Sequence, residues 1–255
     1  MKPFPPPPGF QGRRLPSAFA WFRQGREKPI LSFWRKAGGN LRLGESARRH
    51  PQSTRFSGRL PVVAAPVAGV GTLVVRPCAH GGLWGRLTGD LYLGPDRALR
   101  EIQASQRLAR FKVHTPRIEA VIFYPASLGN RIEVVTSLVP ESQDLVQHLA
   151  RRPGTAERAR LFSAVRKLLD QLQRHGIRHP DLNARNILLA HAPTRGFTAW
   201  LLDVDGVCFG EPGSHRVDQA NRHRLLRSLW KRARLGDLGW SEAEVAKLWC
   251  ELSPR

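Results

Sequence analysis

The sequence predicts an α+β protein in two parts, a strand-rich first part and a mostly helical second part. Short runs rich in Val and Ile, separated by Gly and Pro, fill residues 56–139. Beyond residue 140, apolar residues recur at helical spacing. The 255 residues are 41% hydrophobic, enough for a sizeable core. We therefore expect a partly disordered basic extension over residues 1–52, a β-rich lobe over 53–139 and a helical lobe over 140–255.

Two hairpins are expected in the β-rich lobe. Residues 60–65 and 72–76 are rich in Val, and the segment between them holds Pro66, Gly69 and Gly71, which favour a turn. This apolar run is too short and too broken for a membrane-spanning helix. Residues 120–124 and 131–135 form the second pair, joined through a Gly-Asn turn. Residues 136–140 are then expected to link the lobes.

One helix is expected between the two hairpins. Asp96 is a suitable N-cap, and Ala98, Ile102 and Leu108 fall on one face.

Three helices are expected in the second lobe. Apolar residues from 161 to 172 form one stripe, and Gly176 follows as the residue that ends the helix. Residues 217–235 form a basic helix with an apolar side. Ser241 and Glu244 make a Ser-x-x-Glu capping box that opens the last helix.

The chemically most informative stretch is His179-Pro180-Asp181-Leu182-Asn183-Ala184-Arg185-Asn186, which an apolar trio follows. Further on, the run 199–202 ends in Asp203-Val204-Asp205-Gly206. This ordered set resembles the H-R-D-L-x-x-x-N catalytic loop of protein kinases and the Asp that follows it at a strand end. The alternative is a polar turn in which His and Asp cap each other, followed by a buried strand.

The resemblance to kinases implies ATP and Mg²⁺ as ligands. The phosphates of ATP are polyanionic, so metal ions bridge them, and these ions take hard oxygen ligands. Asn186 would supply an amide oxygen and Asp203 a carboxylate. Asp181 would receive the proton of the acceptor hydroxyl. Asp205 would add to the metal or the acceptor site.

A finer pattern, D-L-N-x-x-N-I-L-L followed by L-L-D-x-D, resembles the bacterial lipopolysaccharide kinase family. This implies a protein-kinase-like two-lobe fold with ATP between the lobes. It also implies phosphotransfer to a hydroxyl of 3-deoxy-D-manno-octulosonic acid (Kdo) on a lipid A precursor. A heptose kinase of the same family is the alternative. The chain lacks the A-P-E segment of regulated protein kinases, which favours a compact glycolipid or small-substrate kinase.

The resemblance assigns three further residues to phosphate binding. Arg76 ends the strand that carries the phosphate-binding lysine in protein kinases, and arginine holds phosphate through its fork of donors. Glu101 occupies the position of the helix glutamate that orients this cation. Gly58 begins the loop over the phosphates. The alternatives are a solvent-facing arginine, a glutamate that pairs along its own helix, and an ordinary turn glycine.

The charge is strongly unbalanced, with 41 Lys and Arg against 20 Asp and Glu, a formal +21. Such a protein favours polyanions: anionic lipid headgroups, a phosphorylated glycolipid or nucleic acid. The family resemblance makes a Kdo-bearing lipid A glycolipid and an anionic membrane surface the expected partners, with nucleic acid disfavoured. An arginine-rich proteome and a solvated basic helix face are the plainer explanations.

The three cysteines form neither a CxxC pair nor a disulfide framework, which favours a reducing compartment. The Pro-rich start lacks the apolar segment of a signal peptide. With the resemblance, we expect a cytoplasmic protein bound peripherally to the inner face of the bacterial inner membrane.

Other functions fit parts of the sequence. Asp203-Val204-Asp205-Gly206 matches the first motif of haloacid-dehalogenase-like phosphatases, but only about fifty residues follow it, without a second strand series. A glycosyltransferase could use the same carboxylates to hold a metal. A zinc site at His175 and His179 is disfavoured because Gly176 and Pro180 interrupt the helix it would need. Charge alone would also fit a non-enzymatic nucleic-acid-binding protein.

Overall fold

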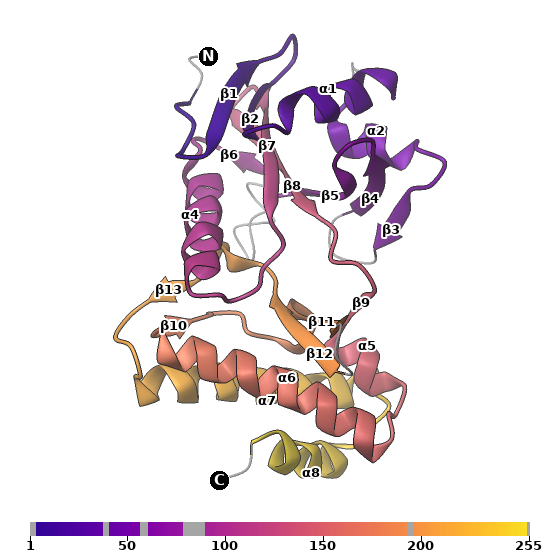
Figure 1. The fold of residues 1–255 in the computed structure, drawn as a ribbon, viewed down its shortest axis with the longest axis vertical. Coiled ribbons are helices and arrows are strands. Elements are labelled where there is room, and N and C mark those ends of the chain that lie inside the picture. Colours follow the sequence, from indigo (N-terminus) through magenta and orange to yellow (C-terminus); the bar gives the residue numbers. More distant parts are fainter. Residues whose placement is uncertain (1–3, 38–40, 57–60, 79–89, 193–195, 254–255) are drawn as a thin grey trace. The chain divides into compact units, whose positions relative to one another are not determined.

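A computed structural model describes residues 4–37, 41–56, 61–78, 90–192 and 196–253 (Figure 1). The chain divides into two compact units. The first contains Met1–Ile102 and Arg117–Leu138, and the second contains Gln103–Pro116 and Val139–Arg255. The expected boundaries differ from these units at residues 103–116, which belong to the second unit although they fall within the predicted β-rich lobe.

The first unit is built on an eight-stranded sheet in the order β1-β2-β7-β8-β5-β4-β3, with β6 also paired to β8. All of these pairs are antiparallel. The strands are β1 (Phe10–Arg14), β2 (Phe19–Arg23), β3 (Thr54–Phe56), β4 (Val62–Val67), β5 (Gly71–Pro77), β6 (Leu91–Tyr92), β7 (Ile118–Ala126) and β8 (Gly129–Ser137). Both predicted hairpins are present, as β4–β5 and β7–β8.

Helices contribute to the apolar clusters on both faces of this sheet because its central strands are apolar on both sides. Phe22 and Ile122 share one cluster with Ile30 of α1 (Glu27–Lys36) and Ala47 of α2 (Leu43–Arg48). Their neighbours along the strands point the other way. Trp21, Val121 and Phe123 share a second cluster with Ala98 and Ile102 of α4 (Asp96–Arg110), the helix predicted to begin at Asp96.

The described residues before position 52 do not form the separate, partly disordered extension that the sequence predicted. β1 and β2 continue the sheet beyond β7, and Trp21 and Phe22 are fully buried. Arg26 and Arg23 also reach the buried carboxylate of Glu119, at 3.0 and 3.7 Å. Trp21 and Phe22 therefore contribute to the core, and Arg23 and Arg26 contribute to an ion-pair network around a buried carboxylate.

The second unit is mostly helical. Its helices are α5 (Leu145–Ala150), α6 (Thr155–Arg174), α7 (His215–Arg234) and α8 (Glu242–Leu252). β9 (Ser142–Asp144), β11 (Ile187–Ala192) and β12 (Gly196–Leu201) form one small sheet, and β10 (Ile177–Arg178) pairs with β13 (Cys208–Phe209). One large apolar cluster joins α6, α7 and α8 to β11 and β12.

The predicted helix ends are confirmed in this unit. α6 ends before Gly176, whose positive φ of 63° suits a glycine, and both halves of the Ser241–Glu244 capping box are formed. The three cysteines are free. Within the described ranges, every helix is too short or too polar to cross a bilayer. The α+β class is confirmed.

Candidate active site

The loop that carries Asp181 lies in the second unit, between β10 and β11. His179 opens it and is buried, with only 2% of its surface exposed. Its ring bonds on both sides: Nδ1 accepts from the backbone N–H of Asp181 at 3.1 Å, and Nε2 lies 2.9 Å from the carbonyl of Leu202. Because Nδ1 is an acceptor, the proton is assigned to Nε2, which donates to Leu202.

Electrostatics agree with a neutral imidazole. Burial lowers the pKa of His179 below its ordinary 6.5, although the Leu202 carbonyl and the carboxylates of Asp203, Asp181 and Asp205 act to raise it. All three carboxylates therefore lie near enough to His179 to influence it. The structure brings the two predicted motifs together around one buried ring.

Asp181 is exposed and is held by Asn183, whose Nδ2 donates to the Asp181 carboxylate at 3.1 Å. The Oδ1 of Asn183 accepts from the backbone N–H groups of Arg185 and Asn186, so Asn183 also caps the short 3₁₀ turn Ala184–Asn186. Asn186 donates its Nδ2–H to the backbone carbonyl of Asp181 at 2.9 Å. This bond identifies which end of the Asn186 amide is the oxygen, the end that a cation would use.

Strand β12 ends at Leu201, and Asp203 is the second residue after it. Its backbone is left-handed, with φ 55° and ψ 56°, a conformation rare for residues other than glycine and common at functional sites. Asp205 lies two residues on, in the 3₁₀ turn Val204–Gly206. The backbone N–H of Leu202 donates to the carbonyl of Asn186 at 2.9 Å, which joins the ends of the two motifs directly.

Side chains of helix α7 anchor the loop by hydrogen bonds to its backbone, a role that the sequence did not predict. Asn221 accepts from the His179 N–H at 3.0 Å and donates to the Ile177 carbonyl at 2.8 Å. Arg224 donates to the Pro180 carbonyl at 2.5 Å, and Ser228 accepts from the Ala184 N–H at 3.0 Å. The spacing of 221, 224 and 228 is the 3–4 residue period of one helix face, the only signal of this role in the sequence.

The predicted phosphate-binding residues lie in the first unit. Arg76 is the last residue but one of β5, and its guanidinium forms an ion pair with the buried Glu101 of α4. Glu101 thus pairs with Arg76 rather than along its own helix. Gly58 lies outside the described residues.

The chain is similar to proteins of a known family. The profile of the "Lipopolysaccharide kinase (Kdo/WaaP) family" matches residues 60–250. The chain belongs to this family.

Relatives in this family are proteins called 3-deoxy-D-manno-octulosonic acid kinase. One from Xanthomonas oryzae pv. oryzae is 31% identical over 84% of this chain and 85% of its own length. One from Vibrio parahaemolyticus is 28% identical over 68% of this chain and 71% of its own length. A solved structure, "WaaP in complex with acyl carrier protein", aligns with 85% of this chain and 96% of that chain at 20% identity and a TM-score of 0.46.

Membership of the lipopolysaccharide kinase family confirms the kinase-like α+β fold and makes the chain a phosphotransferase of lipopolysaccharide synthesis. ATP is the phosphate donor that a kinase family implies. The phosphatase, glycosyltransferase and nucleic-acid-binding alternatives are not favoured.

The donor set fits Mg²⁺. Magnesium takes oxygen ligands, commonly one or two carboxylates together with substrate phosphates. Asn186, Asp203 and Asp205 offer amide and carboxylate oxygens as ligands. In the described part of the chain, no group of three or more His, Cys, Asp or Glu residues lies so that it could hold a metal ion.

Proposed function

We propose that this chain transfers the γ-phosphate of ATP to a hydroxyl of Kdo on a lipid A precursor. The observation that carries the proposal is the His179 ring, which bonds the Asp181 backbone on one side and the residue before Asp203 on the other. The family match spans both motifs, and the named relatives support Kdo as the acceptor sugar.

Asp181 is the proposed base. Its carboxylate, held by Asn183, orients the acceptor hydroxyl and takes its proton as the oxygen attacks the γ-phosphorus in line. The new P–O bond forms at the sugar, the bond to the bridging oxygen of ATP breaks, and ADP leaves. Much of the rate enhancement comes from positioning and charge stabilisation, which the rigid anchoring of the loop supports.

Asn186 and Asp203 are proposed to hold Mg²⁺, with Asp205 beside them. When bound, the ion neutralises charge that develops on the phosphates. Arg76, whose guanidinium pairs with Glu101, is proposed to bind phosphate oxygens. Gly58 is proposed to contribute to the loop over the phosphates.

The site of action is proposed to be the cytoplasmic face of the inner membrane, where the protein binds peripherally. The formal charge of +21 supports attraction to anionic lipid headgroups. Sedimentation with anionic and with neutral vesicles tests this, because electrostatic binding requires the anionic lipid and weakens with salt.

Label transfer from γ-labelled ATP tests the reaction. Kdo-bearing lipid A should be labelled in the presence of Mg²⁺, and the same lipid lacking Kdo should not. Asp181→Asn keeps the size of the side chain and should lower kcat by about 10²- to 10⁴-fold. Asp170→Asn is the matched control, because Asp170 is an exposed residue of α6, with 58% of its side chain accessible. Label entering only heptose-bearing acceptors would replace Kdo with heptose in the proposal, and label entering no glycolipid would refute it.

A further inference from the structure

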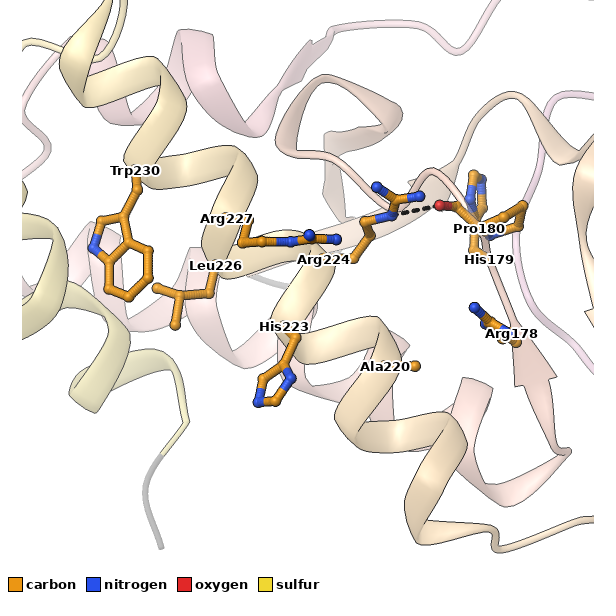
Figure 2. A pocket seen from close by; sticks show the side chains of 9 residues that line it. All are labelled: Arg178, His179, Pro180, Ala220, His223, Arg224, Leu226, Arg227 and Trp230. Carbon is orange, nitrogen blue, oxygen red and sulfur yellow. Dashed lines mark hydrogen bonds between the residues drawn. The ribbon is translucent and has the colours of Figure 1, made fainter.

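A pocket of about 550 Å³ lies within the second unit, between α7 and the start of the catalytic loop (Figure 2). β10 contributes Arg178, the loop contributes His179 and Pro180, and α7 contributes residues between 220 and 230. Figure 2 shows that the two ends of the pocket differ in their side chains: Leu226 and Trp230 lie at one end, and Arg178 and Pro180 lie at the other. Arg224 and Arg227 extend from α7 toward the loop end.

The charged side chains that line this pocket are basic. It is lined by Arg178, Arg224 and Arg227, and no acidic side chain is among its described lining residues. Arg178 and Arg227 are exposed, and neither forms an ion pair with any residue that the structure describes. Arg224 donates a hydrogen bond to the neutral carbonyl of Pro180, which leaves its charge unpaired by this bond.

Other arginines of the same helix are neutralised. Arg222 pairs with Asp218 at 2.7 Å, Arg232 with Asp237 at 2.7 Å and Arg234 with Glu242 at 2.9 Å. Three arginines of α7 thus have acidic partners, whereas Arg224 and Arg227 line the pocket. Arg216, near the start of the helix, is exposed and does not line the pocket.

Several unneutralised guanidinium groups around one concavity favour an anion, and arginine binds phosphate and carboxylate oxygens with two parallel N–H donors. The loop side of the pocket is Pro180, the residue next to the proposed base Asp181. A group bound there lies beside the loop that carries Asp181, so the acceptor, whose hydroxyl must reach Asp181, is the occupant that fits. The apolar end at Leu226 and Trp230 suits a less polar part of the same molecule.

We propose that this pocket binds an anionic group of the acceptor glycolipid, a phosphate or a sugar carboxylate, and thereby presents the acceptor hydroxyl to Asp181. The inference rests on the proposed function and adds the residues that recognise the acceptor. Arg227 and Arg178 supply the donors, and Arg224 joins the pocket to the loop.

The test compares Arg227→Gln and Arg178→Gln with Arg160→Gln. Arg160 is an exposed arginine of α6 that does not line the pocket, so it controls for the loss of one charge. Each pocket variant should raise KM for the Kdo-bearing lipid by about 10- to 100-fold, the effect of losing a charged hydrogen bond, with KM for ATP unchanged. Arg160→Gln should leave both constants at the wild-type values.

Two modified acceptors distinguish the sources of the anion. If the effect of Arg227→Gln disappears with a dephosphorylated lipid, the pocket binds phosphate; if it disappears with a carboxyl-esterified sugar, the pocket binds the carboxylate. An active wild type with Arg227→Gln equal to Arg160→Gln, or a rise in KM for ATP alone, overturns the inference and leaves the proposed function intact. If the wild type labels no Kdo acceptor, the proposed function fails. Equilibrium binding of a deacylated, phosphorylated Kdo saccharide then decides the inference: weaker binding by Arg227→Gln supports it, and equal binding refutes it.

Discussion

The Nε2 of His179 donates a hydrogen bond to the carbonyl of Leu202 over 2.9 Å, which ties the first residue of the catalytic loop to the residue before Asp203. The two residues are separated by 23 positions in the chain. The same ring accepts the backbone N–H of Asp181. One buried side chain thus sets the spacing between the proposed base and the proposed metal ligand.

Replacing His179 by Leu should uncouple these two residues. The substitution leaves the Leu202 carbonyl and the Asp181 N–H without their partner, at a cost on the order of 2–4 kcal/mol in the free energy of unfolding. We expect kcat to fall at least about tenfold with little change in KM for ATP, because the loss is one of geometry. His179→Gln offers a donor to Leu202 and should recover part of kcat; no recovery would count against the bond to Leu202.

Asn221 should matter more than Ser228 for the loop. Asn221 is buried and bonds both the Ile177 carbonyl and the His179 N–H, whereas half-buried Ser228 accepts the Ala184 N–H. Asn221→Ala should lower the free energy of unfolding by about 2–5 kcal/mol and Ser228→Ala by about 1 kcal/mol. Urea unfolding of both variants checks this. Equal losses would mean that α7 anchors the loop through packing rather than through these bonds.

Asp203 and Asp205 should differ in their dependence on Mg²⁺. Asp203→Asn keeps one oxygen but removes the charge, so the Mg²⁺ concentration for half-maximal rate should rise about tenfold or more. Asp205→Asn should cause a smaller rise, since Asp205 is proposed to lie beside the principal ligands Asn186 and Asp203. Mg²⁺ titrations at saturating ATP measure both. The reverse order would make Asp205 the principal metal ligand.

The pair of Arg76 and Glu101 should act on ATP. Arg76→Gln should raise KM for ATP about tenfold, and Arg76→Lys should fall between it and the wild type because lysine provides a point charge without the fork. Glu101→Gln should raise KM for ATP less, since Arg76 remains but loses its charged partner. Arg55→Gln, an exposed residue of β3, is the control. An unchanged KM for ATP in Arg76→Gln would return Arg76 to a structural role.

Glu119 should give the first unit an acid-sensitive stability. Burial alone would raise its pKa, but the hydrogen bonds from Ser137 and Arg117 and the charges of Arg117 and Arg26 hold the pKa below its ordinary 4.5. A carboxyl with a lowered folded-state pKa stabilises above the unfolded value and loses that contribution as the pH falls through the folded value.

Thermal or urea unfolding across pH measures this contribution. The wild type should exceed Glu119→Gln by on the order of 2 kcal/mol above pH 4.5, and the difference should shrink as the pH falls further. A difference that stays constant into the acid range would contradict the assignment. Glu27→Gln, which removes a partly exposed ion pair with Arg13 at 3.3 Å, is a control that should change little.

The segment before residue 52 shows where local sequence reasoning failed. Proline at the start and basic residues beside aromatics suggested a loosely ordered tail, and neither feature reveals a partner 100 residues away. β2 forms because β7 has an open edge for it and because Glu119 lies where Arg23 and Arg26 can reach it. Long-range pairing of this kind leaves only weak periodicity in a five-residue strand.

The amino-acid sequence by itself determined the secondary elements with strong periodicity or caps, such as α6 with Gly176 and α8 with its capping box. It also determined the identity and order of Asp181, Asn186, Asp203 and Asp205, because that chemistry depends on residue types at short spacings. The bonds from α7 to the loop, and the position of Arg224 and Arg227 at a pocket, are visible only in the folded structure. Which side chain meets which backbone group depends on packing between distant segments, and local spacing carries no record of it.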